Sequence, residues 1–318
     1  MIGSNLVKRL VQEGQEVVVV DNFWRGRREN LLLNHGREVI PFRTHLIEAD
    51  LCLPGVLDLI LKDVDFVYHL AGIVADVDFV FKNQGMIFRQ NVLMNSNVVE
   101  SVRGSRVNGY IYVGTACSFP KHLQTGVTAR PLREEDQLPA APESAYGWSK
   151  LMGEYEAFLM ESEARIPVSV LSLHNVYGTP CAIGERAQVI PSLIQRAIRY
   201  PQEPFKVWGS GEQGRAFVHV DDVVEALMLA RLKGMGQGLI QVGVDVCTSI
   251  RELAEIVVKA SAKRISIKYD LSKPEGDRGR RCDASKARQI LGWAPRTTLE
   301  QGIQELYAWV HSKLGCVD

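Results

Sequence analysis

Short runs of β-branched and aliphatic residues alternate along the chain with longer segments in which apolar residues recur every three to four positions. The short runs are typical of buried parallel strands, and the longer period is typical of amphipathic helices. This alternation predicts an α/β fold with a doubly wound parallel sheet. Strands are expected over residues 16–21, 46–50, 65–70, 110–114 and 168–173, and helices over residues 1–11, 91–102, 191–200 and 299–314.

The pattern opens on a helix, whereas a doubly wound sheet usually opens on a strand. Leu6, Leu10 and Val11 share one side of this helix, and the chain starts at what would be the last glycine of a dinucleotide fingerprint, Gly3. The strand and glycine-rich turn that normally precede such a helix supply amides that meet a pyrophosphate. We therefore expect a Rossmann-like sheet that lacks its first strand, through either a misassigned start codon or a truncation that weakens the cofactor site.

The composition narrows the class of protein. The 318 residues are 46% hydrophobic and 23% charged, which fits one large or two closely joined globular domains. Lysine plus arginine and aspartate plus glutamate both number 37, so no global field favours nucleic acid or an anionic membrane as a partner. No apolar run approaches the roughly 18 residues of a membrane span. The six cysteines form no CxxC pair, which predicts no metal site and favours reduced thiols in a cytoplasmic protein.

Acidic and small residues follow several of the expected strands. The first two expected strands end in Asp21 and Asp50. In dinucleotide-binding folds, an acid at the position of Asp21 binds the adenosine ribose hydroxyls and repels a 2′-phosphate, which favours NAD. The alternative is an acid that only starts a turn. Ala71 and Gly72 end the next strand, where small residues let a cofactor approach the backbone closely.

A tyrosine and a lysine stand four residues apart in the segment from Ser144 to Lys150. In a helix this spacing places Tyr146 and Lys150 one turn apart on the same face. A neighbouring ammonium favours a phenolate, so Lys150 is expected to lower the pKa of Tyr146 toward the working range of a general base. The alternative interpretation is the start of an ordinary surface helix.

A hydroxyl and a thiol follow the strand over residues 110–114. Thr115 and Cys117 come directly after it, at the edge where parallel α/β sheets bind ligands. The alternative for Cys117 is a small buried hydrophobic residue. Arginines also cluster between Pro274 and Arg281, a pattern that fits either a solvated loop or a fork for phosphate oxygens.

With these motifs assembled, the chain resembles the extended short-chain dehydrogenase/reductases, specifically their nucleotide-sugar epimerases and dehydratases. The segments that carry the resemblance are Tyr146 with Lys150 and residues 115–120, 174–178, 215–222 and 291–295. The resemblance implies an enzyme that uses NAD, takes a nucleotide-diphosphate sugar as substrate and forms a homodimer. It also implies two domains.

The implied domains divide the chain into four stretches. An NAD-binding domain is expected over residues 1–172 and 216–243. A smaller α/β domain that binds the nucleotide sugar is expected over residues 173–215 and 244–318.

The resemblance also implies roles for single residues. Within the family, the chain is most similar to the GDP-mannose 3,5-epimerases, followed by the GDP-fucose synthases. Tyr146 and Thr115 would act at the sugar 4-hydroxyl while hydride passes to NAD, and Cys117 would be the base on the resulting 4-keto sugar. The implied catalytic residues are Tyr146, Lys150, Thr115 and Cys117. The implied cofactor-binding residues are Gly3, Asp21, Asn22, Asp50, Leu51, Leu70, Ala71, Gly72, Asn91, Tyr146 and Lys150. The implied substrate-binding residues are Asn175, Gln188, Arg215 and Arg278.

The chain departs from the family pattern at the second acid or base. The 3,5-epimerases carry a lysine and the fucose synthases a histidine where this chain has Gln188 or Val189, neither of which donates a proton usefully at neutral pH. Glu185 and Arg186 are the nearby substitutes. The alternative functions are therefore a 4-epimerase or keto-sugar reductase on a UDP-, dTDP- or GDP-sugar, then a 4,6-dehydratase. A truncated, non-catalytic ligand-binding protein is the alternative from another class.

Overall fold

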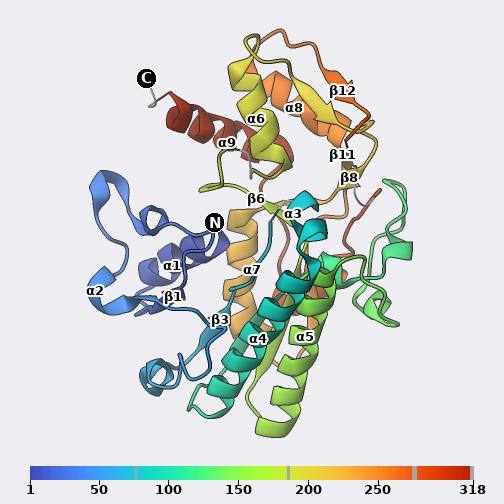
Figure 1. The fold of residues 1–318 in the computed structure, drawn as a ribbon. Helices are drawn as coiled ribbons and strands as arrows, with labels where there is room; N and C mark the ends of the chain where they lie inside the picture. Colours follow the sequence, from blue (N-terminus) through green and yellow to red (C-terminus); the bar gives the residue numbers. More distant parts are fainter. Residues whose placement is uncertain (76, 185–186, 274–277, 316–318) are drawn as a thin grey trace.

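The computed structural model describes residues 1–75, 77–184, 187–273 and 278–315 (Figure 1). Its helices are α1 (Ile2–Gln12), α2 (Phe42–His45), α3 (Val77–Lys82), α4 (Gln84–Arg103), α5 (Ala145–Ala164), α6 (Val189–Arg199), α7 (Val220–Lys233), α8 (Ile250–Ser261) and α9 (Leu299–Leu314). Its strands are β1 (Val19–Asp21), β2 (Leu46–Glu48), β3 (Val67–His69), β4 (Tyr110–Thr115), β5 (Val168–Leu173), β6 (Asn175–Tyr177), β7 (Lys206–Trp208), β8 (Gly214–Arg215), β9 (Phe217–His219), β10 (Leu239–Val242), β11 (Thr248–Ser249) and β12 (Lys268–Asp270). Every strand and helix expected from the hydrophobic pattern is present, although the helix expected over residues 91–102 already begins at Gln84.

Parallel strands form the centre of the larger lobe. Strands β10, β5, β4 and β3 pair in that order, and β1 pairs in parallel with β2. In the described part of the chain β1 forms no ladder with β3, so the sheet is divided into a four-stranded and a two-stranded piece. The register sets Thr115 of β4 opposite Leu173 of β5. Because these strands are parallel, Thr115 lies at the carboxyl edge, where α/β sheets bind ligands.

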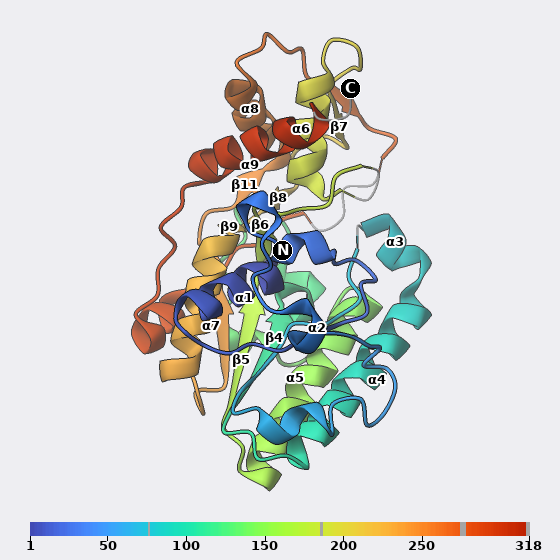
Figure 2. The same cartoon turned by 90° about the vertical axis from the view of Figure 1, so that its left-hand side faces the viewer.

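Helices cover both faces of the four-stranded piece (Figures 1 and 2). On one face α1 and α7 pack in a cluster with Ile111 and Val113 of β4, and on the other α4 and α5 pack with Tyr110 and Tyr112. This alternation follows from the two-residue period of a strand, and all of β4 is buried because both faces are covered. The predicted doubly wound parallel sheet is therefore confirmed.

A second hydrophobic core lies in the upper, smaller lobe of Figure 1, where α6, α8 and α9 come together. Leu193, Leu253 and Leu306 contribute one buried side chain from each of these helices. Residues 282–293 return to the core of the larger lobe, where the Trp293 indole donates a hydrogen bond of 2.7 Å to the carbonyl of Asp222. The domain ranges expected from the sequence stay a prediction.

Helix α5 approaches the end of β4 at glycines. A Cβ on Gly147 of α5 would overlap the carbonyl group of Cys117, and one on Gly114 of β4 would overlap the carboxylate of Glu154. Only glycine permits such close contact at both positions. This contact sets the first turn of α5, which carries Tyr146, directly against the turn that follows β4.

None of the described helices is both long and apolar enough to span a membrane. All cysteines of the described residues are unpaired thiols. They are Cys52, Cys117, Cys181, Cys247 and Cys282.

We expect Gly147→Ala to lower the free energy of unfolding by about 1–3 kcal/mol, because the added methyl group overlaps a backbone carbonyl that cannot rotate away. Gly85→Ala is the matched control. Gly85 lies in the first turn of α4, where an added Cβ meets nothing within 4 Å, so this variant should match the wild type or gain up to about 1 kcal/mol. Urea unfolding measures both. Equal stability of the two variants would contradict the close packing of α5 on β4.

Candidate active site

The predicted tyrosine–lysine pair lies on the first two turns of α5. The hydroxyl of Ser144 caps this helix by accepting a hydrogen bond of 3.3 Å from the Gly147 amide. Tyr146 is half-buried and Lys150 is buried. The Lys150 ammonium lies 4.4 Å from the centre of the Tyr112 ring, a cation–π contact that holds the lysine against β4. The surface-helix alternative is wrong for this segment, because Lys150 points into the protein.

The electrostatics of this pair differ from the expectation. Burial raises the pKa of Tyr146, and a charge on Cys117 raises it further, while a hydrogen bond with Thr115 opposes the rise. Burial lowers the pKa of Lys150 to about 8, opposed by the charge of Glu154. The expected lowering of the phenol pKa is therefore wrong for this structure. The reason is desolvation, which disfavours the charged form of both groups, and the charges that oppose it at the phenol are those of Arg25 and Arg280.

Thr115 and Cys117 form the turn that follows β4. The Thr115 hydroxyl accepts a hydrogen bond of 3.3 Å from the Cys117 amide and also hydrogen-bonds the Tyr146 phenol. Cys117 is half-buried, and its Sγ accepts a hydrogen bond of 3.2 Å from Nη1 of Arg280. The alternative of a small buried hydrophobic residue at Cys117 is therefore wrong, because the thiol faces a charged group. The structure brings Thr115, Cys117 and Tyr146 together as predicted.

Arg280 is the site residue that sequence reasoning missed. Its side chain is buried, and its Nε donates to the side-chain oxygen of Gln124 while Nη1 reaches Cys117. Sequence reasoning selected Arg278, whose side chain is exposed and whose carbonyl accepts a hydrogen bond of 3.0 Å from the Gly214 amide. The signal available in the sequence was the adjacent Gly279, because glycine lets two backbones approach closely. In the structure a Cβ at this position would overlap the backbone of Gly126.

Asn91 locks the small-residue turn after β3 to helix α5. Its Oδ1 accepts a hydrogen bond of 2.7 Å from the Ile73 amide, and its Nδ2 donates to the Ile73 carbonyl at 3.2 Å and to the Ser149 hydroxyl at 3.1 Å. A Cβ on Gly72 would stand 3.8 Å from both Asn91 Oδ1 and Lys150 Nζ. The backbone of this turn therefore passes close to Lys150. Asn91 shapes the predicted cofactor site through the backbone that it holds.

The predicted ribose-binding residues lie in turns that their own side chains support. Asp21 at the end of β1 accepts a hydrogen bond of 2.7 Å from the Phe23 amide, and Asn22 accepts one of 3.0 Å from the Trp24 amide. Asp50 likewise accepts a bond of 2.9 Å from the amide of Cys52. Each carboxylate uses one oxygen in this way, so the turn-starting role that was the alternative for Asp21 is present. A second carboxylate oxygen remains for a ligand, and the ribose role stays a prediction.

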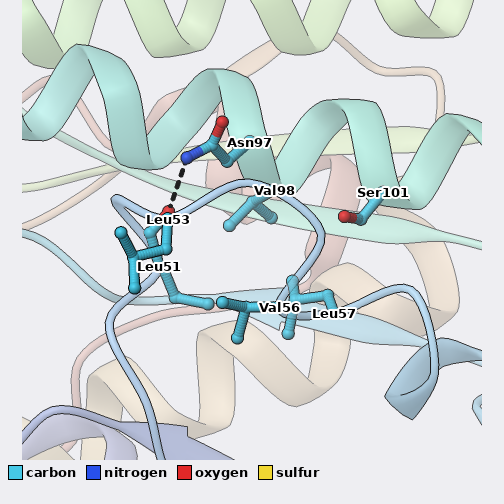
Figure 3. Close-up of a pocket in the computed structure, with 7 residues that line it drawn as sticks. All are labelled: Leu51, Leu53, Val56, Leu57, Asn97, Val98 and Ser101. Carbon is cyan, nitrogen blue, oxygen red and sulfur yellow. Dashed lines mark hydrogen bonds between the residues drawn. The ribbon is translucent and has the colours of Figure 1, made fainter.

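The remaining predicted cofactor residues lie on the same part of the larger lobe. Gly3 is in the first turn of α1, where an added Cβ would meet nothing within 4 Å. Leu51 is fixed to α4, since its carbonyl accepts a hydrogen bond of 2.9 Å from Asn97 and the loop it begins packs on Val98 (Figure 3). Leu70 and Ala71 follow β3 and are half-buried.

The predicted substrate residues come from separate segments. Asn175 on β6 donates a hydrogen bond of 3.5 Å to the Ala216 carbonyl, and Arg215 on β8 donates one of 2.7 Å to its neighbour Gly214. Gln188 is the exposed residue that precedes α6, and its side chain does not cap that helix. Glu185 and Arg186 lie outside the described residues. Among the residues that the structure describes, no group of three or more histidine, cysteine and acidic side chains is arranged to hold a metal ion.

Residues 1–243 match the model of the NAD dependent epimerase/dehydratase family. The chain belongs to this family. The predicted enzyme class and the NAD cofactor are confirmed at the level of the family. This membership favours an enzyme over the non-catalytic binding protein that was the alternative.

Individual relatives span nearly the whole chain. The GDP-mannose 3,5-epimerase of Arabidopsis thaliana is 28% identical over 98% of this chain and 80% of its own length. UDP-glucuronic acid decarboxylase 6 of the same plant is 29% identical over 95% of this chain and 83% of its own. Among solved structures, the UDP-glucose 4-epimerase of Thermotoga maritima with UDP-glucose is 26% identical, with a TM-score of 0.85 over 99% of this chain and 96% of that one.

The described residues fit NAD along the carboxyl edge of the sheet. Asp21 offers a carboxylate for ribose hydroxyls, and Tyr146 and Lys150 offer a phenol and an ammonium for the ribose at the other end. Gly72 adds no side chain between the backbone of this turn and Lys150. These four residues would hold the cofactor.

Two buried histidines near this site make the protein sensitive to acid. Burial lowers the pKa of His69 to about 3, with the charge of Lys150 as the next cause, and lowers the pKa of His174 to about 4. In the unfolded chain a histidine has a pKa of about 6.5. As the pH falls below that value, the unfolded state binds protons that the folded state does not. Stability is therefore full above about pH 6.5 and is lost as the pH falls toward the folded-state values.

We expect His69→Gln to remove part of this acid sensitivity. Between about pH 6 and pH 4, the free energy of unfolding of the wild type should fall more steeply than that of the variant, by about 1.4 kcal/mol per pH unit. Urea unfolding at several pH values measures the two slopes. His122→Gln, at an exposed histidine, is the control and should keep the wild-type slope. The same slope in His69→Gln and in the wild type would refute the neutral buried state of His69.

Proposed function

We propose that this enzyme epimerises a nucleotide-diphosphate sugar through a transient 4-keto sugar, in the manner of a GDP-mannose 3,5-epimerase. The observation that carries the proposal is the Cys117 thiol, which lies beside Tyr146 and accepts a hydrogen bond of 3.2 Å from a buried arginine, Arg280. This contact fixes the sulfur at the end of β4, on the side of the turn that carries Thr115. The similarity to the Arabidopsis GDP-mannose 3,5-epimerase over 98% of the chain supports the same activity.

The oxidation half of the reaction uses the tyrosine and its two neighbours. Tyr146, as the phenolate, accepts the proton of the sugar 4-hydroxyl and becomes the neutral phenol, and Thr115, hydrogen-bonded to Tyr146, orients the same oxygen. Lys150, one helical turn away, supplies positive charge that favours the phenolate before the proton is transferred. Bound NAD would supply the acceptor for hydride from C4 and the donor for its return.

The inversion half uses the thiol. A ketone at C4 acidifies the protons on C3 and C5, because the carbanion left behind is delocalised as an enolate. Cys117 removes one of these protons. Reprotonation from the opposite face then inverts that carbon. Arg280 keeps the thiolate in place and does not compete for the proton, since its guanidinium remains protonated throughout.

The substrate nucleotide is assigned to the smaller domain. We propose that Asn175, Arg215 and Arg278 contact the diphosphate, with Gln188 near the sugar. Arg215 lies on β8, and the Arg278 backbone is hydrogen-bonded to the neighbouring Gly214. This adjacency supports a shared phosphate site at the boundary between residues 173–215 and 244–318 and the NAD-binding part of the chain.

A nucleotide-sugar 4-epimerase is the second candidate. From the sequence, Gln188 or Val189 takes the place of the family's second acid, and neither side chain protonates a carbanion usefully. A 4-epimerase needs no such acid, because its keto sugar turns over and takes the hydride back on its other face. The similarity to the UDP-glucose 4-epimerase of Thermotoga maritima supports this candidate, with a UDP-sugar as the substrate.

The exposed face of α4 and α5 supports a homodimer. Large apolar side chains stand there at helical spacing, partly exposed to solvent. They are Phe88, Leu93, Trp148, Met152, Tyr155 and Leu159. We propose that two copies pair through this face.

A cytoplasmic setting, in which thiols stay reduced, fits the unpaired cysteines of the described residues.

We expect the enzyme, given GDP-mannose and NAD in heavy water, to place deuterium on C3 or C5 of the sugar. Proton NMR of the recovered nucleotide sugar measures the label. Cys117→Ala should abolish the label and leave NAD binding intact, because the thiol acts on the sugar alone. Tyr146→Phe should slow labelling by about 10²–10⁴-fold, the usual contribution of a general base.

The control for this experiment is Cys282→Ala, at a thiol in the core of the larger lobe, which should keep the label. Absence of deuterium label with the wild-type enzyme would contradict the proposed 3,5-epimerase activity on GDP-mannose. UDP-glucose is then the substrate to test: conversion at C4 without solvent deuterium would identify a 4-epimerase.

We expect Tyr155→Glu with Leu159→Glu to convert the homodimer to a monomer. Two buried carboxylates per copy would be forced into an apolar interface. Light scattering after size exclusion should give twice the 35.5 kDa chain mass for the wild type and a single mass for the variant. Leu232→Glu, at a strongly exposed position of α7, is the control and should stay dimeric. A monomeric wild type would contradict the proposed assembly.

A further inference from the structure

Helix α5 carries a buried carboxylate that the reaction described above does not use. Glu154 lies one turn beyond Lys150 and two turns beyond Tyr146, so the three side chains share one face of the helix. Only 1% of Glu154 is exposed to solvent. A glutamate is almost never buried to this extent unless it is paired or hydrogen-bonded, so its surroundings should explain it.

Neighbouring residues leave space for the Glu154 carboxylate and donate hydrogen bonds to it. Gly114 of β4 leaves space that any side chain would take from the Glu154 carboxylate. Gln137, buried in the short helix Glu134–Gln137, donates from Nε2 to Glu154 Oε2 at 2.5 Å and to the Ser118 hydroxyl at 2.9 Å. Ser118 in turn donates to the Thr115 carbonyl at 2.7 Å. These hydrogen bonds link Glu154 to the turn that carries Thr115 and Cys117.

Hydrogen bonding alone leaves this carboxylate incompletely satisfied. Glu154 Oε1 accepts no hydrogen bond of good geometry among the described residues, although the Ser118 hydroxyl and the Thr115 amide lie close enough to lower the pKa of the carboxyl. A buried anion in this position needs a nearby positive charge. Lys150 lies one turn earlier on the same buried face of α5, and its charge lowers the pKa of the carboxyl.

The other titratable groups around Lys150 and Glu154 are neutral, so they supply no competing charge. Tyr112 of β4 lies under Lys150, and burial, then the charge of Glu154, raise its pKa, so it stays a neutral phenol. His69 of β3 is neutral as well, because burial and Lys150 lower its pKa to about 3. Burial moves the pKa of Glu154 up to about 7 and that of Lys150 down to about 8, and each group's charge opposes the shift of the other.

We propose that Glu154 is a positioning residue for the catalytic pair, and that its carboxylate keeps Lys150 in the ammonium form beside Tyr146. The carboxylate works through the lysine and does not touch the substrate. A purely structural glutamate would behave differently on substitution, because the amide oxygen introduced by Glu154→Gln can still accept the hydrogen bond from Gln137. The charge of residue 154, and not its shape, is the quantity to test.

The test is Glu154→Gln, read by NMR of protein that carries ¹³C at the lysine ε-carbons. The Lys150 resonance, assigned with Lys150→Met, is followed against pH. We expect the midpoint of the lysine titration to drop by at least about one pH unit, a tenfold loss of proton affinity, because the buried ammonium loses its counter-charge. An unchanged midpoint in Glu154→Gln would overturn the proposal.

Glu156→Gln is the matched control. Glu156 lies two residues farther along α5, where its carboxylate accepts a hydrogen bond of 3.1 Å from Ser96 of α4 and faces away from Lys150. This variant should keep the wild-type midpoint. Should Glu154→Gln not fold, the wild type provides the same information. Its Lys150 resonance should show a second inflection at the pH where the Glu154 carboxyl carbon titrates, and a single inflection would refute the coupling.

The consequence for turnover rests on the proposed function. With an active sugar substrate, kcat of Glu154→Gln should fall at a lower pH than kcat of the wild type, by the shift measured for Lys150, while KM stays the same. Glu154→Asp, which keeps the charge, should restore the wild-type profile. If the proposed function is wrong but the positioning role is right, the wild type will be inactive on every sugar tested, and the midpoint of its Lys150 titration will still depend on residue 154.

Discussion

The burial of charge between α5 and the end of β4 is the interaction on which the rest of the site depends. Desolvation pushes Tyr146, Lys150 and Glu154 toward their neutral forms, and their hydrogen bonds and opposite charges oppose it. Removing one partner of such a set leaves an uncompensated buried group, which typically costs several kcal/mol. The glycines at positions 114 and 147 let the helix come close enough for these groups to interact.

The same constraint links the cofactor side of the site to the substrate side. Asn91 of α4 holds the turn after β3 and the Ser149 hydroxyl of α5. On the other flank, Gln137 and Ser118 tie Glu154 to the turn that carries Cys117. A rotation of α5 would therefore disturb the space beside Lys150 and the thiol together. The two halves of the proposed reaction share one rigid support.

Local periodicity explains what the sequence could predict. The apolar runs of β4 and β5 and the helical spacing of Tyr146 and Lys150 are encoded within a few residues, and the structure contains each of them. Arg280 could not be found in this way, because it meets Cys117 across 163 positions of the chain. The direction of the Tyr146 pKa shift was missed for a related reason. Desolvation depends on every neighbour in space, whereas spacing along a helix reveals only one.

The arginine beside Cys117 bears on the choice between the two candidate reactions. A 4-epimerase oxidises and reduces C4 and has no use for a base at another carbon. The buried guanidinium of Arg280 is held by the side-chain oxygen of Gln124 as well as by the Cys117 sulfur at 3.2 Å. The guanidinium itself cannot return a proton, since it remains protonated at all physiological pH values. In the proposed 3,5-epimerase reaction Cys117 removes the proton, and the return of the proton falls to another group or to water on the opposite face of the sugar.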